Sequence, residues 1–200
     1  MELVHKAAVF LTNRAIKFSV CKDSEYDIYV YWFETFLGQI ITYFLLVFIG
    51  IAMKCLFQII IYISFFGALC GRASGYHSKT HLGCIIATCT VSIIAVSIAE
   101  RISIDESVFI YPILSIAIAY IAFKAPINHV NLNLSTYEIV CCRKYIKRIL
   151  LVESILIGMF YFYNITAIAI PASLAIITVA VSMILAKILK QEMKEDTHAK

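Results

Sequence analysis

Long runs without a charged residue restrict the fold of this sequence more than any other feature. Roughly 120 of its 200 residues lie in such runs, and at ~20 apolar residues per helical crossing these suffice for about six membrane spans. The hydrophobic share is 62% and the mean hydropathy is +0.88. The charged share is 15%, whereas a soluble domain carries about a quarter charged residues. We therefore predict an all-α, polytopic membrane helical bundle, which excludes a disordered chain, a disulfide scaffold and a nucleic-acid-binding module.

The boundaries of the spans follow from where charges and turn residues interrupt the apolar runs. The stretch from Thr35 to Cys70 contains a single charge, Lys54, and as one helix it would be about 54 Å long, well beyond a ~30 Å bilayer core. We therefore expect two spans there, joined by a turn from Gly50 to Lys54. The six predicted spans lie near residues 35–50, 55–70, 82–99, 107–123, 149–163 and 167–187.

The first 34 residues are predicted to form an amphipathic cytoplasmic segment. Between Leu3 and Phe18, apolar residues recur at helical spacing while basic and polar residues gather on the other side, which is typical of a helix lying on the membrane surface. The segment lacks the apolar core of a cleavable signal peptide. The seven cysteines form no CxxC pair, and we expect free thiols. Residues 1–200 are thus predicted to form a single integral-membrane domain.

The distribution of basic residues predicts the orientation of the chain. With six spans, both termini, the 71–80 loop and the 124–148 loop fall on one side, and 15 of the 17 Lys and Arg residues fall with them. Only Lys54 and Arg101 fall on the other side. Because cytoplasmic loops carry the excess of Lys and Arg, we predict a multi-pass protein of the cell membrane with its termini and those two loops in the cytoplasm.

Polar residues cluster next to the predicted spans at one place, the segment from Arg72 to Cys84. Its His77 and Cys84 are the minimum pair for thiolate chemistry, since a histidine can take the thiol proton and later protonate a leaving amine. In one unbroken helix they would lie about 10.5 Å apart along the axis, so the chain must bend between them. We expect the third span to begin near Leu82, with Cys84 in its first turn. The helix N-terminus, with Arg72 and Lys79, would then favour a thiolate.

Spacing alone leaves other interpretations of this segment. His81 is three residues from Cys84 and could serve as the base, or both histidines could be interfacial polar residues without a catalytic role. His77, His81 and Cys84 could also bind zinc, although no Asp or Glu lies between residues 35 and 99 to act as a general base. A non-catalytic permease or peptide-binding scaffold is the alternative from another class. It predicts charged or broken helices at mid-bilayer, for which Glu153 is the only candidate.

Two motifs carry a resemblance to a known family. The first comprises Arg72, the run Gly75-Tyr76-His77, Lys79-Thr80 and Cys84. The second runs from Lys124-Ala-Pro126 to Asn131 and precedes a basic stretch. With the size, span order and loop placement of nearly the whole chain, these motifs resemble the AgrB family, the membrane-embedded cysteine endopeptidases that process quorum-sensing propeptides in Gram-positive bacteria. The sequence departs from the family at Ser74, where a Gly-Gly pair is commoner, and at Leu132-Asn133, which replaces the usual Lys-Pro.

The resemblance implies a cysteine endopeptidase that cuts an AgrD-like propeptide on the C-terminal side of its signal segment, with Cys84 as nucleophile and His77 as base. Its product would be a thiolactone or lactone macrocycle, formed when a propeptide side chain attacks the acyl-enzyme. Residues 71–84 would be the catalytic loop. The candidates for supporting the site or binding substrate are Arg72, Gly75, Lys79, Arg143 and Lys144.

The partners expected on the same basis are the propeptide, membrane lipid and a second copy in a homodimer. Neither a cofactor, a metal nor nucleic acid is expected. The basic run from Arg143 to Arg148 would anchor the topology or bind an acidic partner segment or lipid headgroups.

Overall fold

The computed structural model describes residues 2–18, 25–76, 78, 80–102, 106–128 and 135–191, apart from the side chains of Leu3, His81 and Glu106. The regular elements among these residues are all helical, which confirms the predicted fold class. They are α1 (Glu2–Lys17), α2 (Tyr26–Ala52), α3 (Leu56–Ala73), α4 (His81–Ala99), the short 3₁₀ helix η2 (Glu106–Phe109), α5 (Ile110–Lys124), α6 (Thr136–Phe162) and α7 (Thr166–Ile188).

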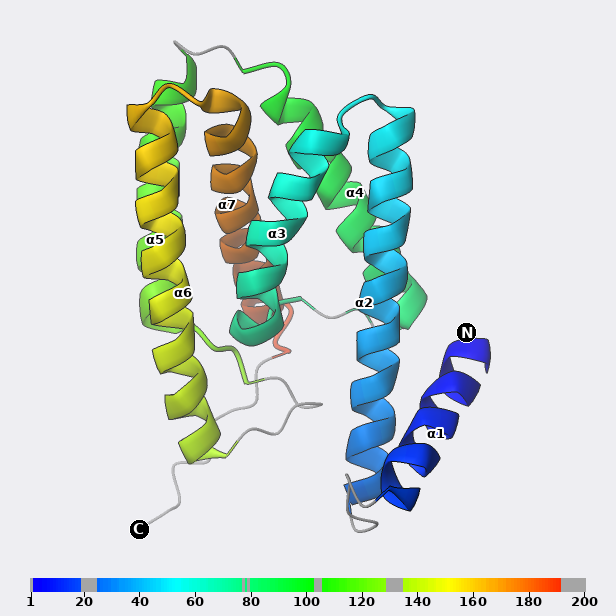
Figure 1. The fold of residues 1–200 in the computed structure, drawn as a ribbon. Coiled ribbons are helices and arrows are strands. Elements are labelled where there is room, and N and C mark those ends of the chain that lie inside the picture. Colours follow the sequence, from blue (N-terminus) through cyan, green and yellow to red (C-terminus); the bar gives the residue numbers. More distant parts are fainter. Residues whose placement is uncertain are drawn as a thin grey trace.

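The helices from α2 to α7 alternate in direction along the bundle (Figure 1). The connections after α2, α4 and α6 lie at one end, and those after α3 and α5 lie toward the other, where α2 begins and α7 ends (Figure 1). Helices α2, α3, α4 and α7, and α5 together with residues 107–109 of η2, are long and apolar enough to cross a membrane. In α6, which has 27 residues, every 18-residue stretch contains three charged residues near its middle, Lys147, Arg148 and Glu153. The uncharged part of α6 is therefore too short to meet the same criterion. The chain is therefore a multi-pass helical membrane protein.

The predicted division of residues 35–70 into two helices is confirmed, since α2 ends at Ala52 and α3 begins at Leu56. The turn lies at residues 53–55, slightly later than the predicted Gly50 to Lys54, because α2 continues through Ala52. A Cβ atom at Gly50 would lie 3.1 Å from the Leu56 Cα atom and 3.3 Å from the Ile59 side chain. The absence of a side chain at Gly50 thus lets the two helices come into contact directly below the turn.

Two predicted starts are wrong. α2 begins at Tyr26 rather than near residue 35, and α6 begins at Thr136 rather than near residue 149. In both cases the helix extends beyond the apolar run, because the backbone N–H and C=O groups of a helix bond to one another in water as well as in lipid. Residues 136–148 of the expected basic loop are consequently helical.

A capping box begins α6. The Ser135 hydroxyl accepts a hydrogen bond from the Glu138 backbone N–H at 3.3 Å, and the Glu138 carboxylate accepts one from the Ser135 N–H at 2.8 Å. The hydrogen bonds from the Ser135 hydroxyl and N–H hold the pKa of the Glu138 carboxyl below its ordinary value. The Ser-x-x-Glu spacing that produces this box is visible in the sequence and predicts a helix start there.

The helix α7 lies inside the bundle, in contact with α3, α4, α5 and α6. Of its most apolar stretch 56% is buried, against 17% to 28% in the other candidate spans. Small side chains let its neighbours approach closely. The buried residues of α7 are Ala169, Ile170, Pro171, Ala172, Ser173, Ala175, Ile176, Val179, Ala180, Met183 and Ala186.

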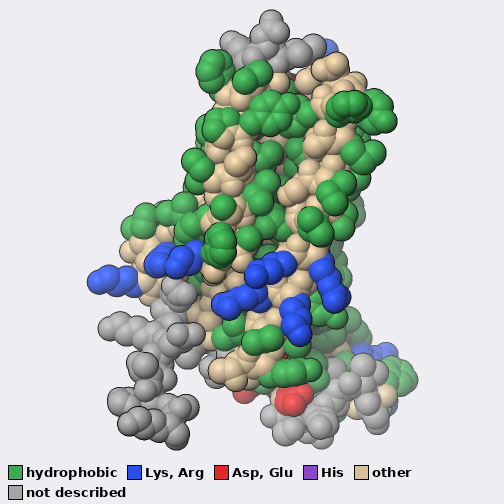
Figure 2. All heavy atoms as spheres, turned by 90° about the vertical axis from the view of Figure 1, so that its left-hand side faces the viewer, with side chains coloured by type: hydrophobic (Ala, Val, Ile, Leu, Met, Phe, Trp, Pro, Cys, Tyr) green, Lys and Arg blue, Asp and Glu red, His purple; other side chains and the backbone are tan. Residues whose placement is uncertain are grey.

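The outer surface of the bundle is apolar. Phe44, Phe48 and Ile116 are 70% to 74% exposed, which is unfavourable in water but suits contact with acyl chains. On the face that carries α5 and α6, apolar side chains cover most of the surface, and Lys and Arg side chains gather in a band below them (Figure 2). This division is the pattern expected where a membrane core meets its headgroup layer.

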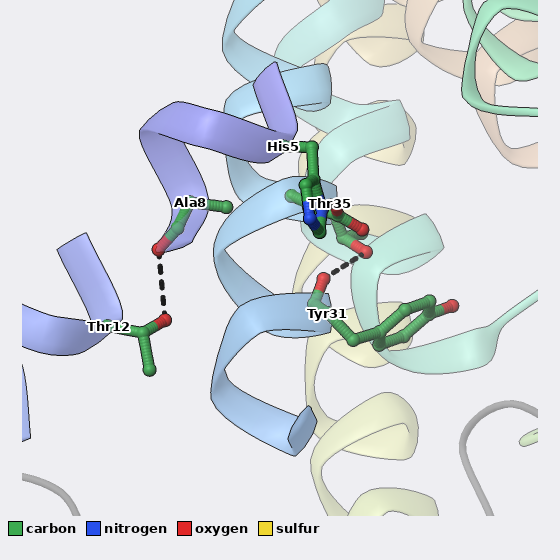
Figure 3. Close-up of polar contacts among 6 residues, drawn as sticks. His5, Ala8, Thr12, Tyr31 and Thr35 are labelled. Atoms are coloured by element: carbon green, nitrogen blue, oxygen red, sulfur yellow. Dashed lines mark hydrogen bonds and ion pairs between the residues drawn. The ribbon is translucent and has the colours of Figure 1, made fainter. Parts of the chain in front are cut away.

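The N-terminal helix α1 packs against the beginning of α2 (Figures 1 and 3). Its buried face includes Ala8 and Thr12, and the buried Thr12 hydroxyl is paired, since it donates to the Ala8 carbonyl at 2.9 Å (Figure 3). His5 of α1 forms a hydrogen bond with Glu34 of α2. The location of α1 on the membrane surface stays a prediction.

The alternating helices and the charge distribution together predict which residues face the cytoplasm. In a variant whose native cysteines are replaced, we expect Lys54→Cys and Arg101→Cys to react with an impermeant thiol reagent in intact cells. Arg14→Cys and Lys190→Cys should react only after lysis, because they lie at the opposite end of the bundle. Labelling of Arg14→Cys in intact cells would contradict the orientation.

Candidate active site

Cys84 lies in the first turn of α4, as predicted. Thr80 caps this turn, since its hydroxyl accepts a hydrogen bond from the Gly83 N–H at 3.1 Å and its carbonyl accepts one from the Cys84 N–H at 3.1 Å. The Cys84 thiol is half-buried and lies close to the Ser78 backbone and the Thr88 hydroxyl. The nucleophile candidate is therefore held by the beginning of a helix and is still accessible at one end of the bundle.

The predicted base is not among the residues that the structure describes. His77 and Lys79 lie outside them, and of His81 only the backbone is described. The choice between His77 and His81, and the zinc site that would use both, therefore remain expectations from the sequence.

The residues before His77 are held against α7. The Tyr76 N–H donates to both the carbonyl and the hydroxyl oxygen of Ser182, at 3.1 Å and 3.0 Å. Gly75 is buried beside the same residue, and a Cβ atom there would lie 2.4 Å from the Ser182 hydroxyl oxygen and 3.2 Å from its Cβ atom. Glycine at position 75 is thus needed for the loop to lie this close to α7.

Ser74 ends α3 with a backbone conformation that glycine adopts more readily. Its φ is 57° and its ψ is 172°, a region that costs on the order of 1–3 kcal/mol for a residue with a side chain. Its hydroxyl is buried and has no hydrogen-bond partner in the described part of the chain. Ser74, which stands where the family more often has a Gly-Gly pair, therefore has a backbone conformation that glycine would adopt without strain.

The second motif lies directly beside the first. The Ile127 N–H donates to the carbonyl of Ala73 at 3.0 Å, and residues 125–127 are buried. The Arg143 Nε–H donates to the Ala125 carbonyl at 3.3 Å, so α6 is tied to the same cluster. The structure thus brings together, at one end of the bundle, two motifs that lie about fifty residues apart in the chain.

The two other cationic candidates that the structure describes, Arg72 and Lys144, lie at or on α6. The Arg72 guanidinium stacks over the Tyr145 ring, with 4.9 Å between its Cζ atom and the ring centroid. A cation over an aromatic face is attracted to it and keeps its remaining N–H donors free. Lys144 is exposed and forms no ion pair with any carboxylate of the described residues.

Ser182 and Tyr145 are the site residues that sequence reasoning missed. Tyr145 stands among the basic residues of α6, and Ser182 is one hydroxyl in a long apolar helix. Neither position carries a local signal, because the role of each comes from a contact with a distant part of the chain.

Comparison with known proteins gives one match. The model of the family described as Accessory gene regulator B, AgrB, matches residues 6–190 of the 200-residue chain. Neither the curated proteins nor the solved structures contain a match.

The contact between Gly75 and Ser182 predicts a non-additive pair of substitutions. Gly75→Ala should cost about 1–3 kcal/mol by overpacking, and Ser182→Ala about 0.5–1.5 kcal/mol through a lost hydrogen bond. The double variant should lose less than the sum, because removal of the hydroxyl makes room for the new methyl group. Thermal unfolding in detergent measures all four proteins, and strict additivity would contradict the contact.

Ser74→Gly is expected to stabilise the protein. It relieves the strained backbone and removes a buried hydroxyl without a partner, so the unfolding temperature in detergent should rise by a few degrees. Ser115→Gly, in the middle of α5, is the matched control and should lower it, because glycine weakens a helix interior. A decrease for Ser74→Gly would contradict the proposed strain.

Proposed function

Because the chain belongs to the Accessory gene regulator B family, we propose that it is a membrane-embedded cysteine endopeptidase that cleaves a quorum-sensing propeptide and promotes its cyclisation. Membership of the family supports the coarser statement by itself, a role in the processing of quorum-sensing peptides. The observation that carries the finer proposal is the position of Cys84, half-buried in the capped first turn of α4.

In this proposal Cys84 is the nucleophile and His77 is its base. His77 takes the proton from the Cys84 thiol, and the sulfur attacks the carbonyl carbon of the scissile peptide bond. The tetrahedral intermediate collapses, the C–N bond breaks, and the amine of the C-terminal part leaves with the proton from His77. The N-terminal part of the propeptide stays on Cys84 as a thioester.

Cyclisation follows from the fate of that thioester. A Cys or Ser side chain within the bound peptide attacks the thioester carbonyl, its proton passes to the base, and the Cys84 thiol is restored as the macrocycle leaves. Nucleophile and ester belong to one bound molecule, which raises their effective concentration. A half-buried sulfur also limits access of water. The contact of Gly75 and Tyr76 with Ser182 of α7 supports this proposal, because it fixes the backbone of the two residues that directly precede His77.

The basic end of α6 is the proposed binding region for the propeptide. Arg143 lies against the Ala125 carbonyl beside the first motif, and Lys144 is exposed next to it. An acidic segment of the propeptide would bind here through charge-assisted hydrogen bonds. Such a contact would orient the peptide before attack.

Co-expression with a cognate propeptide tests the catalytic pair. Cys84→Ala should leave the propeptide uncut, and His77→Ala should slow cleavage about 10²- to 10⁴-fold through loss of a general base. Propeptide size on a gel, with a time course, measures both effects.

Matched variants serve as the controls. Two variants of α4 should retain cleavage: Cys89→Ala, on the same helix as Cys84, and His81→Ala, at the first position of that helix. A chelator should have no effect on the purified enzyme. Full activity of Cys84→Ala, or loss with chelator that zinc restores, would overturn the proposed chemistry.

A propeptide whose ring-closing Cys or Ser is replaced by Ala should trap the thioester. We expect release of the C-terminal part once per enzyme, and a covalent mass increase on the peptide that contains Cys84. Neutral hydroxylamine should remove the adduct, since it cleaves thioesters and leaves amides intact. Full turnover without any adduct would mean that water is the acceptor and that the enzyme does not cyclise its product.

A further inference from the structure

A groove between α3 and α6 opens on the outside of the bundle. Its volume is about 410 Å³, within the range of small-molecule sites. Most of its lining is apolar, including Phe65 and Ala68 of α3 and Val152 and Leu156 of α6, and several of these side chains are exposed. Ser64 of α3 and two ionisable residues of α6, Arg148 and Glu153, are the polar part of the lining.

Two cations without an acidic partner among the described residues meet at one ring near the groove: Arg148, which lines the groove, and Arg72. The guanidinium groups of Arg72 and Arg148 lie 4.9 Å and 5.9 Å from the centroid of the same Tyr145 ring. Neither forms an ion pair with a carboxylate in the described part of the chain. Two positive groups that share one aromatic ring and no acid attract an anion.

Glu153 provides an independent sign of a ligand. It is 6% exposed, it lines the groove, and its Oε2 atom is buried without a hydrogen-bond partner among the described residues. It follows Arg148 by five residues, which is about 7.5 Å along a helix. A buried carboxyl oxygen without a partner is costly, and a bound polar group would remove that cost.

The order of these groups along α6 matches the order of groups in a phospholipid. The basic residues end at Arg148, and the apolar part of the helix begins at Ile149. A phosphate at the level of Arg148 would put ester carbonyls near Glu153, whose protonated form can donate to them, and an acyl chain along the apolar lining. A propeptide segment has no comparable reason to lie on a surface that faces acyl chains.

We infer that the groove between α3 and α6 is a binding site for one anionic phospholipid. Its phosphate is held by Arg148 with the help of Arg72, and an acyl chain fills the groove beside Ala68 and Val152. The bound lipid would connect α3, which leads into the Gly75 loop, to α6.

The test uses the purified full-length chain in neutral detergent. It is titrated with phosphatidylglycerol, with phosphatidylcholine of the same acyl chains, and with inorganic phosphate. Native mass spectrometry counts the retained lipid, and thermal unfolding follows its effect. We expect only phosphatidylglycerol to be retained and to raise the unfolding temperature. Equal retention of both lipids, or the same response to inorganic phosphate, would overturn the inference.

Two variants locate the site. Arg148→Gln should weaken phosphatidylglycerol binding about fivefold or more through loss of one cation. Ala68→Trp should block binding, because its indole fills the groove from an exposed position. The matched controls are Arg101→Gln, at the opposite end of the bundle, and Ile155→Trp, exposed on α6 outside the groove, and both should bind as the unaltered protein does.

Other occupants give different results. If Ala68→Trp keeps its bound phosphatidylglycerol but raises the KM for the propeptide, the groove holds substrate. If the same variant keeps its lipid but loses a dimer, the groove holds a second copy. Either result, or unchanged lipid binding by both groove variants, would overturn the inference.

Discussion

The burial of α7 is the constraint on which the rest of the structure depends. Lipid offers helices no hydrophobic reason to associate, so their contacts depend on close packing of small side chains and on hydrogen bonds between helices. α7 provides both. Ala172 and Ala180 are buried, and the Ser173 hydroxyl lies 3.3 Å from the Tyr161 hydroxyl of α6. Helices α3, α4, α5 and α6 all contact this one, and the backbone around the candidate site is held by the same helix.

The candidate site depends on that packing more than on its own loop. The Gly75-Tyr76 backbone is attached to Ser182 of α7, and the end of α3 is attached to the segment at Ile127. Cys84 belongs to a third element, the beginning of α4, which Thr80 caps. A small shift of α3 relative to α7 would therefore change the position of the loop relative to the thiol. Residues far from the chemistry can affect it in this way.

The helix α6 combines two environments in one element. Its first half carries exposed basic residues beside the candidate site, and its second half is apolar and lies along α3 and α7. A peptide substrate and a membrane lipid would both meet this helix, at adjacent positions. The proposed propeptide region at Arg143 and Lys144 therefore lies about one helical turn from Arg148, which lines the proposed lipid groove.

The sequence by itself determined the elements of this protein. Uncharged runs and the charges that interrupt them predicted an all-helical membrane bundle, the turn at Lys54 and the position of Cys84 in the first turn of its helix. These features are local, because a helix in lipid must satisfy its own backbone and a charge ends an apolar run. The early start of α6 was also encoded locally, in the Ser135 and Glu138 capping box.

Only the tertiary structure decided which elements meet. The burial of α7, the contact of Ser182 with the loop and the stacking of Arg72 on Tyr145 join residues that no spacing relates. The candidate spans of α4 and α7 have mean hydropathies of 2.3 and 2.4, yet 22% of one and 56% of the other is buried, so hydropathy does not distinguish the helix that lipid covers from the helix that protein covers. That choice follows from the fit of side chains across helix interfaces, a property of pairs of surfaces rather than of any one segment.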